Sequence, residues 1–209
     1  MSVPGRDYSS TPLPRIHRPR RQSEAVAYRP CLRIEFGYTC AYCVSHEAEV
    51  ARGAKHGLFE VEHFRPEHAF GHLRTVYANL MWACAACNRA KSGKWPSAVA
   101  QARGSRFVDP CAEALSEHLQ IVELEVVPRT AAGEYMIDEL NLNSFEHRTR
   151  RKERKQSFAI WKGLKFAIET NDFSPAERLE MQAEAMRILE LLLGSHAPSD
   201  VATTCKCVL

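Results

Sequence analysis

The chain has 209 residues, which is enough for one compact domain with appendages or for two small domains. Its hydrophobic content of 45% and charged content of 25% are ordinary for a soluble globular protein, and its net charge of +3 permits a nucleic-acid partner without demanding one. The start of the chain lacks the apolar core of a signal peptide, and no apolar stretch approaches the ~18 residues of a membrane span. These features argue against secretion and membrane insertion and favour a reducing cytoplasm.

The first 25 residues are rich in arginine and proline. They hold four prolines and five arginines but few apolar residues, and the acid Asp7 stands alone among them up to position 21. This composition predicts a disordered basic arm over 1–25, which is either a plain flexible terminus or an arm that grips phosphate. Pro30 then suits the first position of a short helix that leads to the first cysteine pair.

Two short strands and a helix are expected in the middle of the chain. Residues 59–64 alternate apolar and polar side chains and are closed by Pro66, which is typical of a strand. Residues 79–83 form a second expected strand, and 85–91 a helix that ends at 92–93. The predicted order is therefore strand, loop, strand, helix.

The later part of the chain is expected to be mainly helical. Residues 119–127 predict one strand, followed by a turn at 132–133 and a helix from 144 to about 168. A second helix should begin with Ser174 as N-cap, with Pro175 and Glu177 completing a capping box, and end at Gly194. The last fifteen residues have the composition of a disordered tail.

The cysteines give a strong metal signal. Four of the eight stand in two Cys-x-x-Cys pairs, formed by Cys40 and Cys43 and by Cys84 and Cys87. Thiolates from two such pairs fill the tetrahedral shell of zinc and leave no open position, so this zinc should be structural. The alternative is four reduced cysteines that pack as small hydrophobic side chains.

Polar residues between the two pairs have the types that phosphodiester hydrolysis requires. His63 would serve as the base that deprotonates water, and oxygen atoms of Glu62 and Asn88 suit a magnesium ion. Strict alternation would direct Glu62 and His63 to opposite faces of a strand. We therefore expect the strand to end or twist there, before Pro66.

Residues 40–91 resemble the HNH endonucleases. The resemblance rests on Cys-Ala-Tyr-Cys, then Val-Glu-His-Phe-Arg-Pro, then Tyr-Ala-Asn-Leu-Met-Trp-Ala-Cys-Ala-Ala-Cys-Asn-Arg-Ala-Lys. It implies a ββα-metal fold with His63 as general base and Asn79 holding the loop that orients it. It also implies that Glu62 and Asn88 bind the catalytic Mg²⁺ or Mn²⁺, with Glu62 where Asp is commoner.

A weaker resemblance continues downstream. Phe107-Val108-Asp109-Pro110, the expected strand near Leu119, Gly133, and Leu140-Asn141-Leu142-Asn143 followed by Arg148 look like the tail of bacterial HNH proteins from anti-phage operons. The resemblance implies that such a protein acts as an effector beside a partner ATPase.

Several basic residues are candidates for contact with nucleic acid. These candidates are Arg65, Lys91, Lys94, Arg151 and Lys155. Arg151 and Lys155 share one face of the expected helix and would form a ridge against the phosphate backbone. A solvated helix end at Lys91 and Lys94, and a solvated face at 148–155, are the alternatives.

The sequence as a whole predicts an α+β protein. We expect a disordered arm over 1–25, a zinc-clamped ββα-metal nuclease core over 26–110, a small strand pair with a C-terminal helical extension over 111–193, and a disordered tail over 194–209. The expected function is metal-dependent hydrolysis of nucleic acid, with double-stranded DNA as the substrate and zinc plus Mg²⁺ or Mn²⁺ as cofactors. The alternatives are a non-catalytic zinc ribbon that binds nucleic acid or protein, and a ribonuclease that uses the same site.

Overall fold

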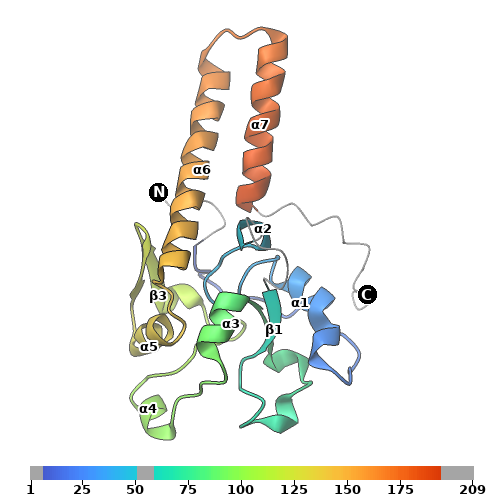
Figure 1. Cartoon of the computed structure of the whole chain (residues 1–209), viewed down its shortest axis with the longest axis vertical. Coiled ribbons are helices and arrows are strands. Elements are labelled where there is room, and N and C mark those ends of the chain that lie inside the picture. Colours follow the sequence, from blue (N-terminus) through green and yellow to red (C-terminus); the bar gives the residue numbers. More distant parts are fainter. Residues whose placement is uncertain (1–6, 51–58, 194–209) are drawn as a thin grey trace.

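Figure 1 shows a computed structural model of the chain, which describes residues 7–50 and 59–193. The expectations for residues 1–6, for a stop at Gly194 and for a disordered tail lie outside the described residues. The elements follow in the order η1 (Ala25–Tyr28), α1 (Arg29–Glu35), α2 (Glu47–Val50), β1 (Phe59–His63), η2 (Gly71–Leu73), η3 (Tyr77–Asn79), β2 (Leu80–Cys84), α3 (Ala85–Lys91), α4 (Ala98–Ala102), η4 (Leu115–Glu117), β3 (Leu119–Val122), β4 (Glu125–Pro128), α5 (Ala131–Glu139), α6 (Phe145–Thr170) and α7 (Pro175–Leu193).

The centre of the molecule is an antiparallel strand pair followed by a helix. β1 pairs with β2 so that Phe59 lies opposite Cys84 and His63 lies opposite Leu80. α3 begins directly after β2, with Cys84 as its N-cap, and ends where Ser92 takes a left-handed conformation. The predicted α+β architecture with a ββα core is therefore confirmed, and the expected strand and helix boundaries hold to within one residue at this site.

The N-terminal segment differs from its prediction. Residues 7–24 contain no helix or strand, but they pack against the core and do not behave as a free arm. Tyr8 is buried, and Leu13 donates a backbone hydrogen bond to Pro110. Arg15 pairs with Glu35 at 3.0 Å and donates to the backbone oxygen of Leu80 at 2.6 Å. Composition missed this packing because the segment is tied down by single side chains and not by a periodic apolar pattern.

The region after residue 118 contains a hairpin where one strand was expected. β3 and β4 pair antiparallel, and Glu123 turns the chain with a φ of 57°. No Gly, Asn or Pro marks this turn, so no local pattern indicated it. The turn expected at 132–133 is also wrong, because Thr130 caps α5 and its side chain accepts a hydrogen bond from Gly133.

Two long helices form an antiparallel hairpin that rises away from the rest of the molecule (Figure 1). Ser144 caps α6, and Ser174 with Glu177 forms the expected capping box of α7. The lower part of α6 contacts the core, whereas the upper part packs mainly against α7. No helix in the described ranges 7–50 and 59–193 is long and apolar enough to cross a membrane.

Candidate nuclease site and zinc centre

The four cysteines of the two Cys-x-x-Cys pairs come together in one buried cluster. Their sulfur atoms lie within 4.8 Å of one another, and the sulfurs of Cys43 and Cys84 are 3.7 Å apart. A tetrahedral zinc with Zn–S bonds near 2.3 Å requires sulfur separations of about 3.8 Å. The donor set and its spacing fit zinc, and all four positions of the ion would be filled by protein. The predicted structural zinc site is therefore supported by both sequence and geometry.

The cysteines of the cluster influence one another's protonation. Burial raises the pKa of the Cys40 thiol and hydrogen bonds, first of all from Cys40, raise the pKa of Cys87, whereas hydrogen bonds, first of all from Cys40, hold the pKa of Cys43 well below its usual value. Within the cluster a thiolate is therefore favoured at Cys43. A thiolate is the form in which cysteine binds zinc.

His147 is a residue of the zinc centre that the sequence did not indicate. It is carried by the first turn of α6, is buried, and places its Nε2 atom 3.7 Å from the sulfur of Cys87. A ring N–H in this position would donate to a zinc-binding thiolate and hold it in place. No spacing rule connects His147 to Cys87, because 60 residues separate them.

His63 lies at the end of β1 with its ring half-buried. Its Nε2 atom is 2.9 Å from the backbone oxygen of Arg74. A carbonyl oxygen can only accept, so the neutral ring carries its proton on Nε2 and leaves Nδ1 as an acceptor. That tautomer suits a ring that removes a proton from water.

Asn79 fixes the loop that follows His63. Its Oδ1 accepts from the backbone N–H of Arg65 at 2.9 Å, and its Nδ2 donates to the backbone oxygen of Arg65 at 3.0 Å. The backbone oxygen of Asn79 also accepts from Phe64. The Asn79 side chain therefore binds both the backbone N–H and the backbone oxygen of Arg65, which lies two positions beyond His63.

β1 ends at His63, in agreement with the expectation that the strand ends or twists before Pro66, and Glu62 and His63 have different partners. Glu62 is 4% exposed and faces α3, where its carboxylate accepts from Lys91 at 2.5 Å and from the hydroxyl of Tyr42. Burial, and then the charge of Glu62, raise the pKa of Tyr42 well above its usual value, so this hydroxyl remains a donor. Asn88 contacts Glu60 instead of Glu62.

Two of the residues expected to contact phosphate are buried. Lys91 is 1% exposed and donates to Glu62 and to the backbone oxygen of His63. Arg151 is 5% exposed and donates to the backbone oxygens of Leu124 and Leu142. The expectation of a phosphate contact is therefore wrong for Lys91 and Arg151, because their donors are used inside the protein.

The other basic candidates remain accessible. Arg65 is exposed in the loop after His63, with its guanidinium 5.7 Å from the centre of the Phe70 ring and 6.0 Å from that of Trp95. Lys94 and Lys155 are exposed and pair with Glu139 and Glu123. Arg65 is thus the basic candidate nearest along the chain to His63.

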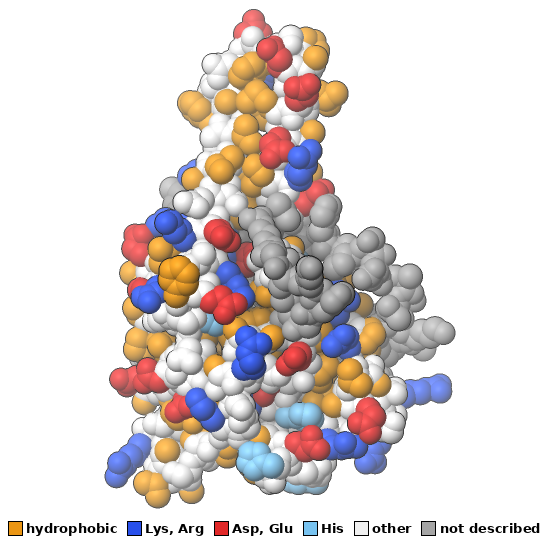
Figure 2. All heavy atoms as spheres, in the orientation of Figure 1, with side chains coloured by type: hydrophobic (Ala, Val, Ile, Leu, Met, Phe, Trp, Pro, Cys, Tyr) orange, Lys and Arg blue, Asp and Glu red, His pale blue; other side chains and the backbone are white. Residues whose placement is uncertain are grey.

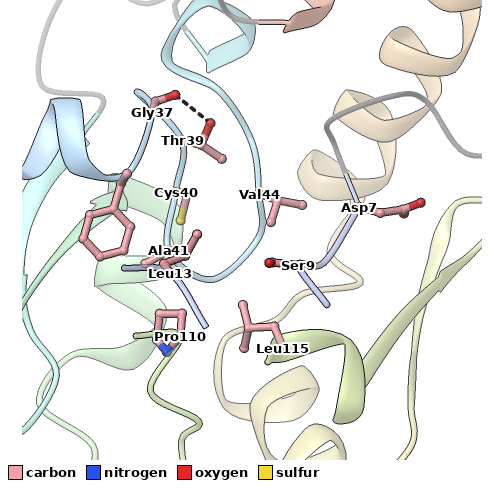
Figure 3. A pocket seen from close by; sticks show the side chains of 11 residues that line it. Asp7, Ser9, Leu13, Gly37, Thr39, Cys40, Ala41, Val44, Pro110 and Leu115 are labelled. Atoms are coloured by element: carbon pink, nitrogen blue, oxygen red, sulfur yellow. Dashed lines mark hydrogen bonds between the residues drawn. The ribbon is translucent and has the colours of Figure 1, made fainter. Parts of the chain in front are cut away.

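A cavity of about 280 Å³ lies beside Cys40 of the first cysteine pair. Figure 3 shows that the N-terminal segment, the Cys40 loop and the 110–115 segment line it, with Leu13, Val44 and Leu115 among the apolar walls. Its polar side chains are Asp7, Ser9 and Thr39. None of the residues proposed for phosphate chemistry lines this cavity, so it is separate from the candidate active site.

Comparison with known families agrees with the geometry. The model of the family described as HNH endonuclease matches residues 40–94, which span both cysteine pairs, β1, β2 and α3. No curated protein matches the chain. At the level of the family, the match supports a nuclease-type function and metal binding. Residues 40–94 are thus similar to the HNH endonucleases, and the four-cysteine cluster fits the type that has two Cys-x-x-Cys pairs.

Proposed function

We propose that the protein is a divalent-metal-dependent endonuclease that hydrolyses phosphodiester bonds in nucleic acid, with double-stranded DNA as its substrate. The observation that carries the proposal is the placement of His63, whose Nε2 is engaged by the oxygen of Arg74. Its Nδ1 is thereby left to accept a proton from water. A zinc ribbon that only binds nucleic acid has no need of a histidine held in this tautomer.

In the proposed reaction, His63 removes a proton from a water molecule that attacks phosphorus in line with the leaving 3′ oxygen. Asn79 keeps the loop after His63 in place, so the ring is positioned before substrate arrives. Arg65 would contact the phosphate backbone beside the site. The products would carry 5′-phosphate and 3′-hydroxyl ends.

The catalytic cation would be held on the side of β1 that faces α3. Asn88 offers an amide oxygen there, and the β1 carboxylates on that side belong to Glu60 and Glu62. Mg²⁺ prefers oxygen ligands and takes one or two from protein. When bound, the ion would stabilise negative charge on the phosphate and on the leaving oxygen.

The test is a comparison of plasmid cleavage by the wild type, His63→Ala and Asn88→Ala with Mg²⁺ or Mn²⁺. His63→Ala should lower the rate by roughly 10² to 10⁴-fold, the usual contribution of a positioned base, with zinc content and DNA affinity unchanged. Asn88→Ala should be partly rescued by high Mn²⁺. His72→Ala is the matched control, since His72 is exposed in the loop between β1 and β2.

Two results would correct the proposal. Cleavage by His63→Ala at the wild-type rate would eliminate the nuclease mechanism and leave the zinc-ribbon alternative. Cleavage of RNA alone, in a parallel assay with single-stranded RNA, would retain the mechanism and change the substrate to RNA.

The biological setting is a separate proposal, supported by the resemblance of residues 107–148 to the tail of HNH proteins from anti-phage operons. We propose a cytoplasmic effector of antiviral defence that acts beside an ATPase. The test is the plating efficiency of phage on cells that express the chain with the neighbouring ATPase. Protection that is equal for wild type and His63→Ala would contradict this role.

A further inference from the structure

β1 presents two carboxylates to α3, and the structure gives them different partners. Glu60 and Glu62 are two residues apart and so lie on the same face of the strand. Asn88 and Lys91 are three apart and lie on one face of the helix. The amide of Asn88 donates to Glu60, and the ammonium of Lys91 donates to Glu62.

The carboxylate of Glu62 is paired with a positive charge and has a hydrogen-bond donor at each oxygen. Oε1 accepts from Lys91 at 2.5 Å and Oε2 accepts from the hydroxyl of Tyr42, in a place where both the glutamate and the lysine are almost fully buried. Lys91 also donates to the backbone oxygen of His63 at 2.8 Å. A divalent cation at Glu62 would have to separate this buried pair, which would leave the ammonium without its counter-charge.

Glu60 lies in a setting that suits a cation better. It is half-buried and contacts Asn88 of α3, the residue for which the sequence resemblance implies a metal-binding role. The Asn88 amide donates its N–H₂ to Glu60 in the structure, and rotation of that amide would present its oxygen instead. A carboxylate and an amide oxygen would then converge on one point, as magnesium requires.

We propose that Glu60, together with Asn88, holds the catalytic cation, and that Glu62 is a positioning residue. Glu62 would act through Lys91, whose bond to the backbone oxygen of His63 fixes the end of β1 beside the base. The inference rests on the proposed nuclease function but changes its ligand set: the metal carboxylate stands three residues before the histidine, not one. This assignment also explains why a buried lysine accompanies Glu62.

The experiment measures Mn²⁺ binding to the zinc-loaded full chain without nucleic acid, by the electron paramagnetic resonance signal of free Mn²⁺. Glu60→Gln should weaken binding at least ~10-fold, since loss of a mere supporting partner already costs that much. Glu62→Gln should bind Mn²⁺ with an affinity within about threefold of that of the wild type. The same variant should melt at a lower temperature, because Lys91 loses its charged partner. Glu67→Gln controls for the loss of one negative charge, because Glu67 is exposed in the loop after Pro66.

Cleavage of plasmid by the same proteins separates the two levels of the proposal. If Glu62→Gln loses Mn²⁺ and Glu60→Gln keeps it while the wild type cuts DNA, the ligand assignment is overturned and the nuclease function stands. If the wild type neither binds Mn²⁺ nor cuts, the nuclease function itself fails. Should Glu62→Gln not fold, Glu60→Gln decides alone: wild-type affinity in that variant overturns the assignment.

Discussion

Lys91 carries a charge into a place where its side chain is 1% exposed. Its ammonium donates to the carboxylate of Glu62 and to the backbone oxygen of His63, and it lies 5.3 Å from the centre of the Phe107 ring. The lysine thus joins α3, the end of β1 and the segment after α4. Its position just past Asn88, a candidate metal ligand, suggested a phosphate contact, and only the fold reveals that it faces inward.

Replacement of Lys91 by methionine tests this structural role. The change keeps most of the side-chain volume but leaves Glu62 as a buried charge without its partner, so we expect a loss of about 3–5 kcal/mol in the free energy of unfolding. The measurement is a urea titration of both variants and the wild type. Lys94→Met is the control, since its exposed pair with Glu139 should contribute at most about 1 kcal/mol. Equal losses in the two variants would show that the burial of Lys91 does not matter to stability.

Arg151 gives a second residue-scale prediction. Its guanidinium donates to the backbone oxygens of Leu124 and Leu142 and to the side chain of Asn143, so Arg151→Ala should cost on the order of 2 kcal/mol in unfolding free energy. The salt dependence of DNA binding should stay unchanged, because no phosphate contact is lost. Lys155→Ala, at an exposed pair with Glu123, should leave the stability nearly unchanged. A shallower salt slope in Arg151→Ala would restore the phosphate-binding interpretation.

The sequence indicated candidate site residues, but it did not indicate their contacts. His63 and Asn79 could be identified because residue type and order carry the family pattern. The pairing of Glu60 with Asn88, and of Glu62 with Lys91, depends on the alignment of α3 over β1, which no local pattern specifies. The expected end of β1 before Pro66 is confirmed, and there Glu62 contacts Lys91 whereas His63 contacts the backbone oxygen of Arg74.

At the scale of elements, α5 lies very close to the start of β3. A Cβ atom added at Gly133 would stand 1.9 Å from the backbone oxygen of His118, so only glycine fits in this turn of the helix. The sequence alone predicts a turn at this glycine, because the packing that requires a glycine there is not visible in the sequence. The close approach is between backbones that belong to different elements, and a pattern along one segment cannot reveal it.

Gly133→Ala should therefore destabilise the protein, whereas the same change in α6 should not. Overpacking typically costs about 1–3 kcal/mol, and contact with a backbone atom places Gly133→Ala at the upper end. Gly163→Ala is the matched control, because nothing lies within 4 Å of its added Cβ and alanine favours a helix interior by roughly 0.5–1 kcal/mol. Thermal melting of both variants is the measurement. A melting temperature of Gly133→Ala at or above that of Gly163→Ala would contradict this account of the packing.

At the scale of the whole molecule, the zinc centre is where the helical extension joins the nuclease core. His147 of α6 contacts Cys87. Farther along the same helix, Arg154 pairs with Glu49 at 2.8 Å, beside the first cysteine pair. Farther along, the hairpin leaves the core, and Figure 2 shows hydrophobic side chains spread over its surface. Ile160, Phe166, Leu179 and Met186 are each more than half exposed there. In a pair of helices, each helix buries only one stripe of its surface against the other. The stability of the extension therefore depends on its base at the zinc centre.

Removal of zinc should consequently loosen both parts together. The cluster links the loop at 40–43 to the start of α3, in a segment too small to form a large core of its own, so metal binding contributes directly to folding. The wild type should contain about one zinc per chain, and Cys84→Ser should lose it and melt without a cooperative transition. Hydrogen exchange should rise in α3 and also in residues 145–155, because His147 loses its thiolate partner.

Cys111→Ser is the control, since Cys111 is half-buried and outside the cluster. A Cys84→Ser protein that keeps its zinc and its melting temperature would contradict the zinc assignment; protection of 145–155 that survives zinc loss would show that the extension folds independently of the metal.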